Sequence, residues 1–279
     1  MEIQGGNKIM AELFKVDSTK IVGGPGRLVS APYGTVLPET IEDLIDPTTY
    51  VLKPGWEDVG ATQEGIKVTR SYDEEETEVD QIQGPAETTI TKWSHDVSTL
   101  LAENSIENRQ LALIGGAIIQ KAPKYGTAVK LKGELAVGAT IITLATAAGA
   151  DFKVGGFLKI GSETKKIVSV SGSTITIDTG ISTAATVETD VTPVTALGTK
   201  RIGYGTVSDA PMRSAALISK HEKTGALTVV VFRKVKVSGE SKEQTWGKEK
   251  RTLPLSLKAF AEGNVATQEN VYYEIEQVI

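Results

Sequence analysis

The chain of 279 residues contains no cysteine, only two histidines, and few aromatic residues, which make up 5% of the sequence. Without cysteine the protein can form no disulfide, no thiolate zinc or iron–sulfur centre, and no cysteine nucleophile. Neither histidine, His95 or His221, has a partner at metal-ligand spacing. We therefore expect both to be surface or interface residues, and we predict no metal site and no cofactor.

Motifs that identify catalytic sites are also missing. The sequence has no Gly-x-Ser-x-Gly elbow, no Gly-x4-Gly-Lys-Ser/Thr phosphate loop and no His-Glu-x-x-His zinc motif. The glycine-rich segment 23–26 lacks a following lysine and contains Pro25, which removes an amide donor, so it predicts a turn. Two distant carboxylates could still converge in a glycosidase site, but a sugar-cleaving cleft is usually lined with aromatic residues. The prediction is that the protein is not an enzyme.

The balance of charge is mildly acidic. The sequence has 30 basic and 35 acidic side chains, which gives a formal net charge of −5. Gripping duplex DNA depends on neutralising phosphates with lysine and arginine, so this balance instead suits a surface along which DNA passes. The longest apolar stretch, 111–119, is too short to cross a membrane, and the first twenty residues lack a secretory signal pattern. We expect a soluble protein made in a cytoplasm, with no membrane partner.

The abundant residues favour β-structure. Hydrophobic residues make up 40% of the sequence, enough for a substantial core, and threonine, valine, isoleucine, alanine and glycine dominate. This composition predicts a mainly β protein with many short strands. Residues 1–50 carry many glycines and prolines, so we expect an extended arm, with one short helix over 39–45, that becomes ordered on a partner surface.

An acidic run separates two predicted strands. Alternating apolar and polar residues predict strands over 66–70 and 88–97. The run between them consists of Asp73, Glu74, Glu75, Glu76, Glu78 and Asp80. Because like charges repel and cannot pack in a core, we expect a loop over 71–87 that is solvated, faces a lumen or contacts another subunit. Some of these acids could bind calcium, but the run lacks the Asp-x-Asp-x-Asp-Gly spacing of a calcium loop.

One helix and three later strands are predicted from periodicity. An apolar stripe over 97–114 predicts a helix, with Asp96 or Ser98 as its cap and Gly115-Gly116 as its stop. Strands are predicted over 228–237, 251–259 and 271–278. In the second of these, one face carries Leu253, Leu255, Leu257 and Ala259.

Residues 127–198 differ in composition from the rest of the chain. They contain no Trp, Tyr, Met, His or Arg and are rich in short β-branched segments. The tight link Ser171-Gly172-Ser173 predicts a hairpin of strands 164–170 and 174–177. Turn residues flank both ends of the segment. We therefore predict a small all-β domain inserted into a host domain formed by residues 1–126 and 199–279.

The three tryptophans, Trp56, Trp93 and Trp246, lie beside turns or in an alternating strand. Such positions favour anchors in the core or at an interface over a stacking platform for a ligand.

An ordered set of segments then carries a resemblance. It begins with Gly-Trp-x-x-Val-Gly at 55–60 and Gly-Ile-Lys-Val at 65–68, and continues through the acidic run into 79–85. A tryptophan-bearing strand follows and leads into 100–108, and the strands at 228–237 and 253–257 close the pattern. Together these segments resemble the tail tube, or major tail, proteins of long-tailed bacteriophages.

The resemblance implies a β-sandwich with one flanking helix and long hairpin loops, carrying the inserted domain as an external decoration. It also implies hexameric rings that stack into a tube through which DNA leaves the virion. Implied partners are further copies of the chain and other tail proteins such as the tape measure and terminator, with assembly in the cytoplasm of the host. A negative lumen would keep the DNA backbone from sticking.

Other interpretations remain open. A surface adhesion or carbohydrate-binding β-protein would use the inserted domain for recognition, and a glycoside hydrolase would use acids from 73–80. The inner tube of a contractile injection machine shares the fold implied by the resemblance, so the sequence does not separate it from a phage tail tube.

Overall fold

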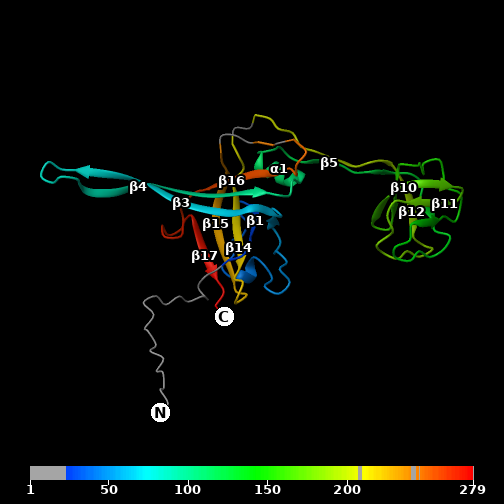
Figure 1. Cartoon of the computed structure of the whole chain (residues 1–279), viewed down its shortest axis with the longest axis horizontal. Helices are drawn as coiled ribbons and strands as arrows, with labels where there is room; N and C mark the ends of the chain where they lie inside the picture. The colour runs from blue at the N-terminus through cyan, green and yellow to red at the C-terminus, as the bar shows by residue number, and fades with distance from the viewer. Residues whose placement is uncertain (1–22, 207–208, 240–242, 245, 279) are drawn as a thin grey trace, which may run out of the picture. The chain divides into compact units, whose positions relative to one another are not determined.

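The chain folds into two compact units (Figure 1). A computed structural model describes residues 23–206, 209–239, 243–244 and 246–278. One unit is formed by the chain up to Gly116 and from Tyr204 onward, and the other by Ala117–Gly203. Among the described residues there are one α-helix, one short 3-10 helix and seventeen strands, so the predicted mainly β fold class is confirmed. Of the N-terminal arm predicted over 1–50, residues 1–22 lie outside the described residues. The prediction is wrong for the described remainder, because Gly26–Pro32 form a strand of the first unit's sheet and Ile41, Leu44 and Ile45 are buried in its core.

The first unit contains an eight-stranded antiparallel sheet. Its path has the order β2-β1-β14-β15-β16-β4-β3, and β17 also pairs with β15. The strands are β1 (Gly26–Pro32), β2 (Glu57–Asp58), β3 (Thr62–Glu78), β4 (Pro85–Leu101), β14 (Arg213–Lys220), β15 (Leu227–Val237), β16 (Leu253–Ala259) and β17 (Tyr272–Glu276). The strands predicted near the end of the chain are thereby confirmed, each within a few residues of its expected limits.

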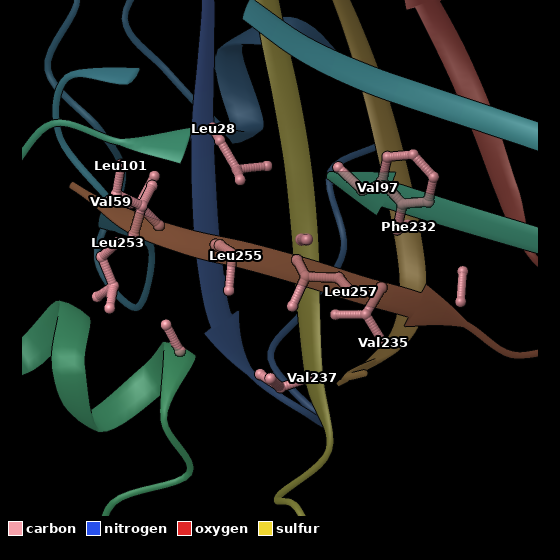
Figure 2. Packing of buried hydrophobic residues seen from close by; sticks show 13 residues of the cluster. Leu28, Val59, Val97, Leu101, Phe232, Val235, Val237, Leu253, Leu255 and Leu257 are labelled. Carbon is pink, nitrogen blue, oxygen red and sulfur yellow. The ribbon is translucent and has the colours of Figure 1, made fainter. Parts of the chain in front are cut away.

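The central strands of this sheet are buried on both faces. Along β15, Val229 and Val231 pack into one apolar cluster, whereas Phe232 and Val235 pack into another. A strand covered on both sides needs apolar residues at successive positions, which explains the valine-rich run in β15. The alternating leucines of β16 are all buried, as the sequence predicts. Figure 2 shows β16 crossing the face of β1 and β14, which produces a β-sandwich.

The face of the sheet that carries Val229 and Val231 is covered by the segment that follows β1 in the chain. Its buried side chains are Ile41, Leu44, Ile45 and Trp56. The helix predicted over 39–45 is reduced to the 3-10 turn η2 (Ile41–Asp43). Asp43 fixes its start, because the carboxylate accepts hydrogen bonds from the backbone N–H and the hydroxyl of Thr40.

The helix predicted over 97–114 is wrong in its first half. Residues up to Leu101 belong to β4, and α1 (Ile106–Ala112) begins only after Ser105, whose hydroxyl accepts a hydrogen bond from the Asn108 N–H at 3.0 Å. Val97 and Leu101 are four residues apart, a spacing that fits one helix face and also one strand face. Pairing decides the conformation, since Val97 lies opposite Leu257 of β16 in the sheet.

The second unit contains nine short strands. They are β5 (Ile119–Lys121), β6 (Lys124–Tyr125), β7 (Val129–Lys130), β8 (Ile141–Thr143), β9 (Phe157–Ile160), β10 (Glu163–Ser171), β11 (Thr174–Ile177), β12 (Asp190–Ala196) and β13 (Thr199–Arg201). Seven of them, β6 to β12, form one sheet that closes into a ring. The predicted β10–β11 hairpin is confirmed, with Gly172 at a φ of 60° in its turn.

Hydrogen bonds close the ring between the segments of β7 and β8. The N–H of Lys132 donates to the carbonyl of Thr143, and that of Ala145 to Lys130, each at 2.8 Å. Twelve buried apolar residues fill the interior. Outside the ring, β5 and β13 pair antiparallel with Ile119 opposite Arg201, so the chain enters and leaves this unit at neighbouring positions.

A carboxylate ties two segments of the second unit together. Glu163 accepts hydrogen bonds from the backbone N–H groups of Ser182 and Thr183, each at 2.9 Å. Lys165 forms an ion pair with Glu163 at 3.0 Å and also donates to the carbonyl of Gly180 at 2.8 Å. The amide of Ser182, followed by the charge and hydrogen bond of Lys165, lowers the pKa of Glu163 to about 2.

We expect Glu163→Gln to lower the melting temperature of the second unit at pH 7. The pKa of Glu163 is lower in the folded state than its ordinary value of 4.5, so the ionised carboxylate stabilises the fold at neutral pH. That contribution disappears as the pH falls from 4.5 towards 2, and the two melting curves should converge there. Thermal unfolding across this range measures it, with the exposed Glu134→Gln as the matched control. A difference that persists at the acid end would contradict the assignment.

Candidate functional site

The most exposed element of the first unit is the hairpin of β3 and β4 (Figure 1). Both strands are 17 residues long and pair along their length, with Arg70 opposite His95. The pairing of β4 with β16 ends at His95, so the hairpin continues beyond this point with two strands alone. Every residue from 67 to 93 is exposed. A two-stranded ribbon without further strands is only marginally stable in water, so this ribbon is a candidate contact surface for another molecule.

The acidic residues lie on this ribbon. Asp73, Glu74, Glu75, Glu76 and Glu78 belong to β3, opposite residues 85–92 of β4, and Asp80 lies in the turn that connects the strands. The predicted loop over 71–87 is therefore wrong as secondary structure. Charge repulsion excludes these residues from a core but not from a strand whose two faces are both solvated, which is the reason for the error.

A row of rings joins the ribbon to the core. Tyr72 and Trp93 lie opposite each other with ring centroids 5.0 Å apart, and the guanidinium of Arg70 lies 4.2 Å from the Trp93 ring. His95 follows, 6.2 Å from Trp93 and 5.6 Å from Tyr272 of β17. Ring–ring and cation–π contacts contribute free energy in addition to that from burying apolar area, so this row stabilises the attachment of the ribbon to the rest of the unit.

His95 is buried, which corrects the expectation of a surface or interface residue. Burial, with the positive charge of Arg70 as a second cause, lowers the pKa of His95, while Asp96 acts in the opposite direction. The second histidine, His221, closes a turn after β14 by accepting hydrogen bonds from the backbone N–H groups of Lys223 and Thr224.

The three tryptophans have different environments. Trp56 is part of the core beneath the sheet. Trp93 is 44% exposed on the ribbon, and Trp246 is 66% exposed with the Arg251 guanidinium 3.6 Å from its ring. Only Trp56 is therefore a core residue in the isolated chain.

A cavity of about 830 Å³ opens at the base of the ribbon. β15 pairs with β17 through residues 228–232 and with β16 through residues 235–237, so the sheet divides at this point. The cavity lies at the division, and its lining includes Arg70, Lys92, Trp93, Lys258, Phe260 and Tyr272. The sequence did not indicate this cluster, because Lys258 and Arg70 are far apart in the chain. They line the same cavity because β4 pairs with β16 on one side and with β3 on the other.

Among the described residues, no group of three or more histidine, aspartate or glutamate residues is placed to hold a metal ion. The one α-helix in this described part of the chain has seven residues, and no helix there is long and apolar enough to cross a membrane.

Comparison with protein families gives one match. A family model described as phage tail tube protein matches residues 15–140, which include the whole ribbon and α1. The predicted resemblance to tail tube proteins is confirmed. A comparison with curated proteins finds no match. The matched range begins before the described residues and ends within the second unit.

The tail tube match agrees with the architecture. A mainly β sandwich with one short helix and a projecting ribbon is a structural framework, and the match supports a structural role in a virion tail. It also supports self-assembly and contact with other tail proteins. A structural family of this kind favours a protein that is not an enzyme.

Proposed function

We propose that this chain builds the tail tube of a bacteriophage as hexameric rings that stack around a channel for DNA. The family match over residues 15–140 is the observation that carries the proposal. The structure supplies the physical support. β3 is an edge strand whose outer side pairs with no described strand, and long exposed edges are templates for pairing with another chain. Closing a ring of subunits would remove that edge.

The acidic ribbon has two roles in this proposal. Asp73, Glu74, Glu75, Glu76, Glu78 and Asp80 contact neighbouring subunits or face the lumen. An acidic lumen repels the phosphate backbone, so DNA would slide through without being held. Trp93 and Trp246, exposed in the single chain, serve as anchors between subunits, since half-exposed tryptophans are typical of interfaces.

The second unit is proposed to be a decoration carried by the tube-forming unit, with residues 127–198 as its core. Its closed ring of strands and its own apolar interior support independence from the assembly. We further propose that the tube forms in the cytoplasm of the host with a tape measure and a terminator protein as partners, and that the protein acts without catalysis.

Electron microscopy of the purified chain at increasing concentration tests the proposed function. Rings or tubes with a hollow centre are expected above a threshold concentration, and six-fold symmetry in averaged end views is expected for the rings. Adding an extract of tail-tip proteins controls for a need for nucleation. A chain that stays monomeric under both conditions would contradict the proposal and favour an adhesion-type β-protein.

A further inference from the structure

The cavity at the base of the ribbon is lined by an unbalanced set of charges. Arg70, Lys92 and Lys258 contribute three cations, and Glu274 contributes the one acid among its lining residues. None of the three cations forms an ion pair with a residue that the structure describes. Like charges gathered around one cavity repel, so a negatively charged occupant would be stabilised there.

The outer end of the ribbon has the complementary properties. Six acids lie between residues 73 and 80, and two apolar side chains, Val79 (38% exposed) and Ile82 (58% exposed), lie at its turn. The cavity offers aromatic walls for such side chains, since Trp93, Phe260 and Tyr272 line it. Acidic and apolar groups on one surface therefore correspond to cationic and aromatic groups on the other, the pattern of a specific interface.

The tip of the ribbon cannot reach the cavity at the base of the same ribbon. A strand rises about 3.3 Å per residue, so Asp80 at the tip lies roughly 30 Å beyond Arg70 along a ribbon that extends away from the body. Figure 1 shows β3 and β4 running outward without turning back. The occupant must therefore come from another molecule.

We propose that the cavity binds the acidic end of the ribbon, residues 73–82, from a second copy of the chain. The proposal rests on the proposed self-assembly and names the two surfaces that meet. The ribbon end and the cavity are different surfaces of the same chain, so the contact between two copies is head-to-tail. Each copy can donate its ribbon end to one neighbour and accept the ribbon end of another. Such a contact continues from copy to copy, which closes a ring or extends a stack.

Charge reversal tests the pairing. Arg70→Glu with Lys258→Glu takes the charge of the cavity lining from +2 to −2. Changing Glu74, Glu75, Glu76 and Glu78 to lysine takes the charge of residues 73–80 from −6 to +2. Either set is expected to raise the threshold concentration for assembly at least about tenfold, because like charges then meet. A chain with both sets of changes should assemble again, and so should an equal mixture of the two charge-reversed variants. Lys248→Glu with Lys250→Glu, two exposed lysines outside the cavity, is the matched control and should behave as the unchanged chain.

Thiol cross-linking gives a second and direct measurement. The chain has no cysteine, so Glu76→Cys with Lys258→Cys introduces the only two thiols. A short bis-maleimide should join them between copies and give a ladder of dimers and higher oligomers under denaturing conditions. Glu76→Cys with Lys250→Cys is the control and should remain mostly monomeric.

The outcomes separate this proposal from the proposed function. If the unchanged chain forms tubes while both charge-reversed variants assemble like the control, or while the cross-linked ladder is missing, the docking proposal is overturned and the tail tube stands. If the unchanged chain forms neither rings nor tubes, the proposed function fails and the docking proposal fails with it. Circular dichroism of every variant confirms that a loss of assembly is not a loss of folding.

Discussion

Shortening the ribbon is expected to leave a folded monomer that forms no rings or tubes. Glu74 and Ile90 lie opposite each other, so residues 75–89 can be replaced by Asn-Gly, a sequence suited to a two-residue hairpin turn. The removed side chains are all exposed, so the melting temperature should change little. Assembly should disappear, because the change removes four of the six acids and the outer end of the free edge of β3.

Electron microscopy and sedimentation measure this result. Thr88→Ser with Thr89→Ser keeps the ribbon at full length and is expected to assemble as the unchanged chain does. The shortened chain retains Arg70, Lys92 and Trp93, so its cavity remains intact and a loss of assembly would be assigned to the ribbon end. Tubes of normal appearance from the shortened chain would remove the ribbon from the assembly interface.

The second large effect concerns the independence of the two units. Phe232 is fully buried in the first unit and Leu158 in the second, each within its own apolar cluster. Phe232→Ala is expected to cost about 3–5 kcal/mol and Leu158→Ala about 2–5 kcal/mol, since each leaves a cavity that the surroundings fill only partly. Each should lower one thermal transition by roughly 10 °C or more and leave the other in place.

Differential scanning calorimetry of the purified chain distinguishes the transitions. The exposed Val36→Ala in the first unit and Val154→Ala in the second are matched controls and should shift neither. A single transition that moves with both buried substitutions would mean that the two units unfold together, and residues 117–203 would then not be an independent domain.

The periodicity of the sequence predicted those strands in which buried and exposed side chains alternate regularly. The alternating leucines of β16 predicted a strand with one buried face, and the structure confirms it. The β10–β11 hairpin followed from two β-branched runs joined by a link containing Gly172, which adopts a positive φ. In both cases the information is local, because the side chains that decide the conformation are within a few residues of one another.

Periodicity failed where one spacing fits two conformations. Val97 and Leu101 fit a helix or a strand, and only the partner strand β16, more than 150 residues later, selects the strand. The acidic run shows that charge alone predicts exposure to solvent but not secondary structure. Repulsion correctly excludes Asp73–Asp80 from a core, but whether such residues form a loop or a solvated ribbon depends on pairing with β4.

The sequence by itself determined the mainly β fold class and the resemblance to tail tube proteins, because composition, alternation and ordered motifs are properties of the chain alone. Only the tertiary structure decided where His95 lies, which tryptophan is in the core, and that Arg70, Lys92 and Lys258 surround one cavity. The physical reason is that β-sheets join residues far apart in the chain. Burial and charge clustering in such a sheet depend on strand pairing, and no local pattern contains that pairing.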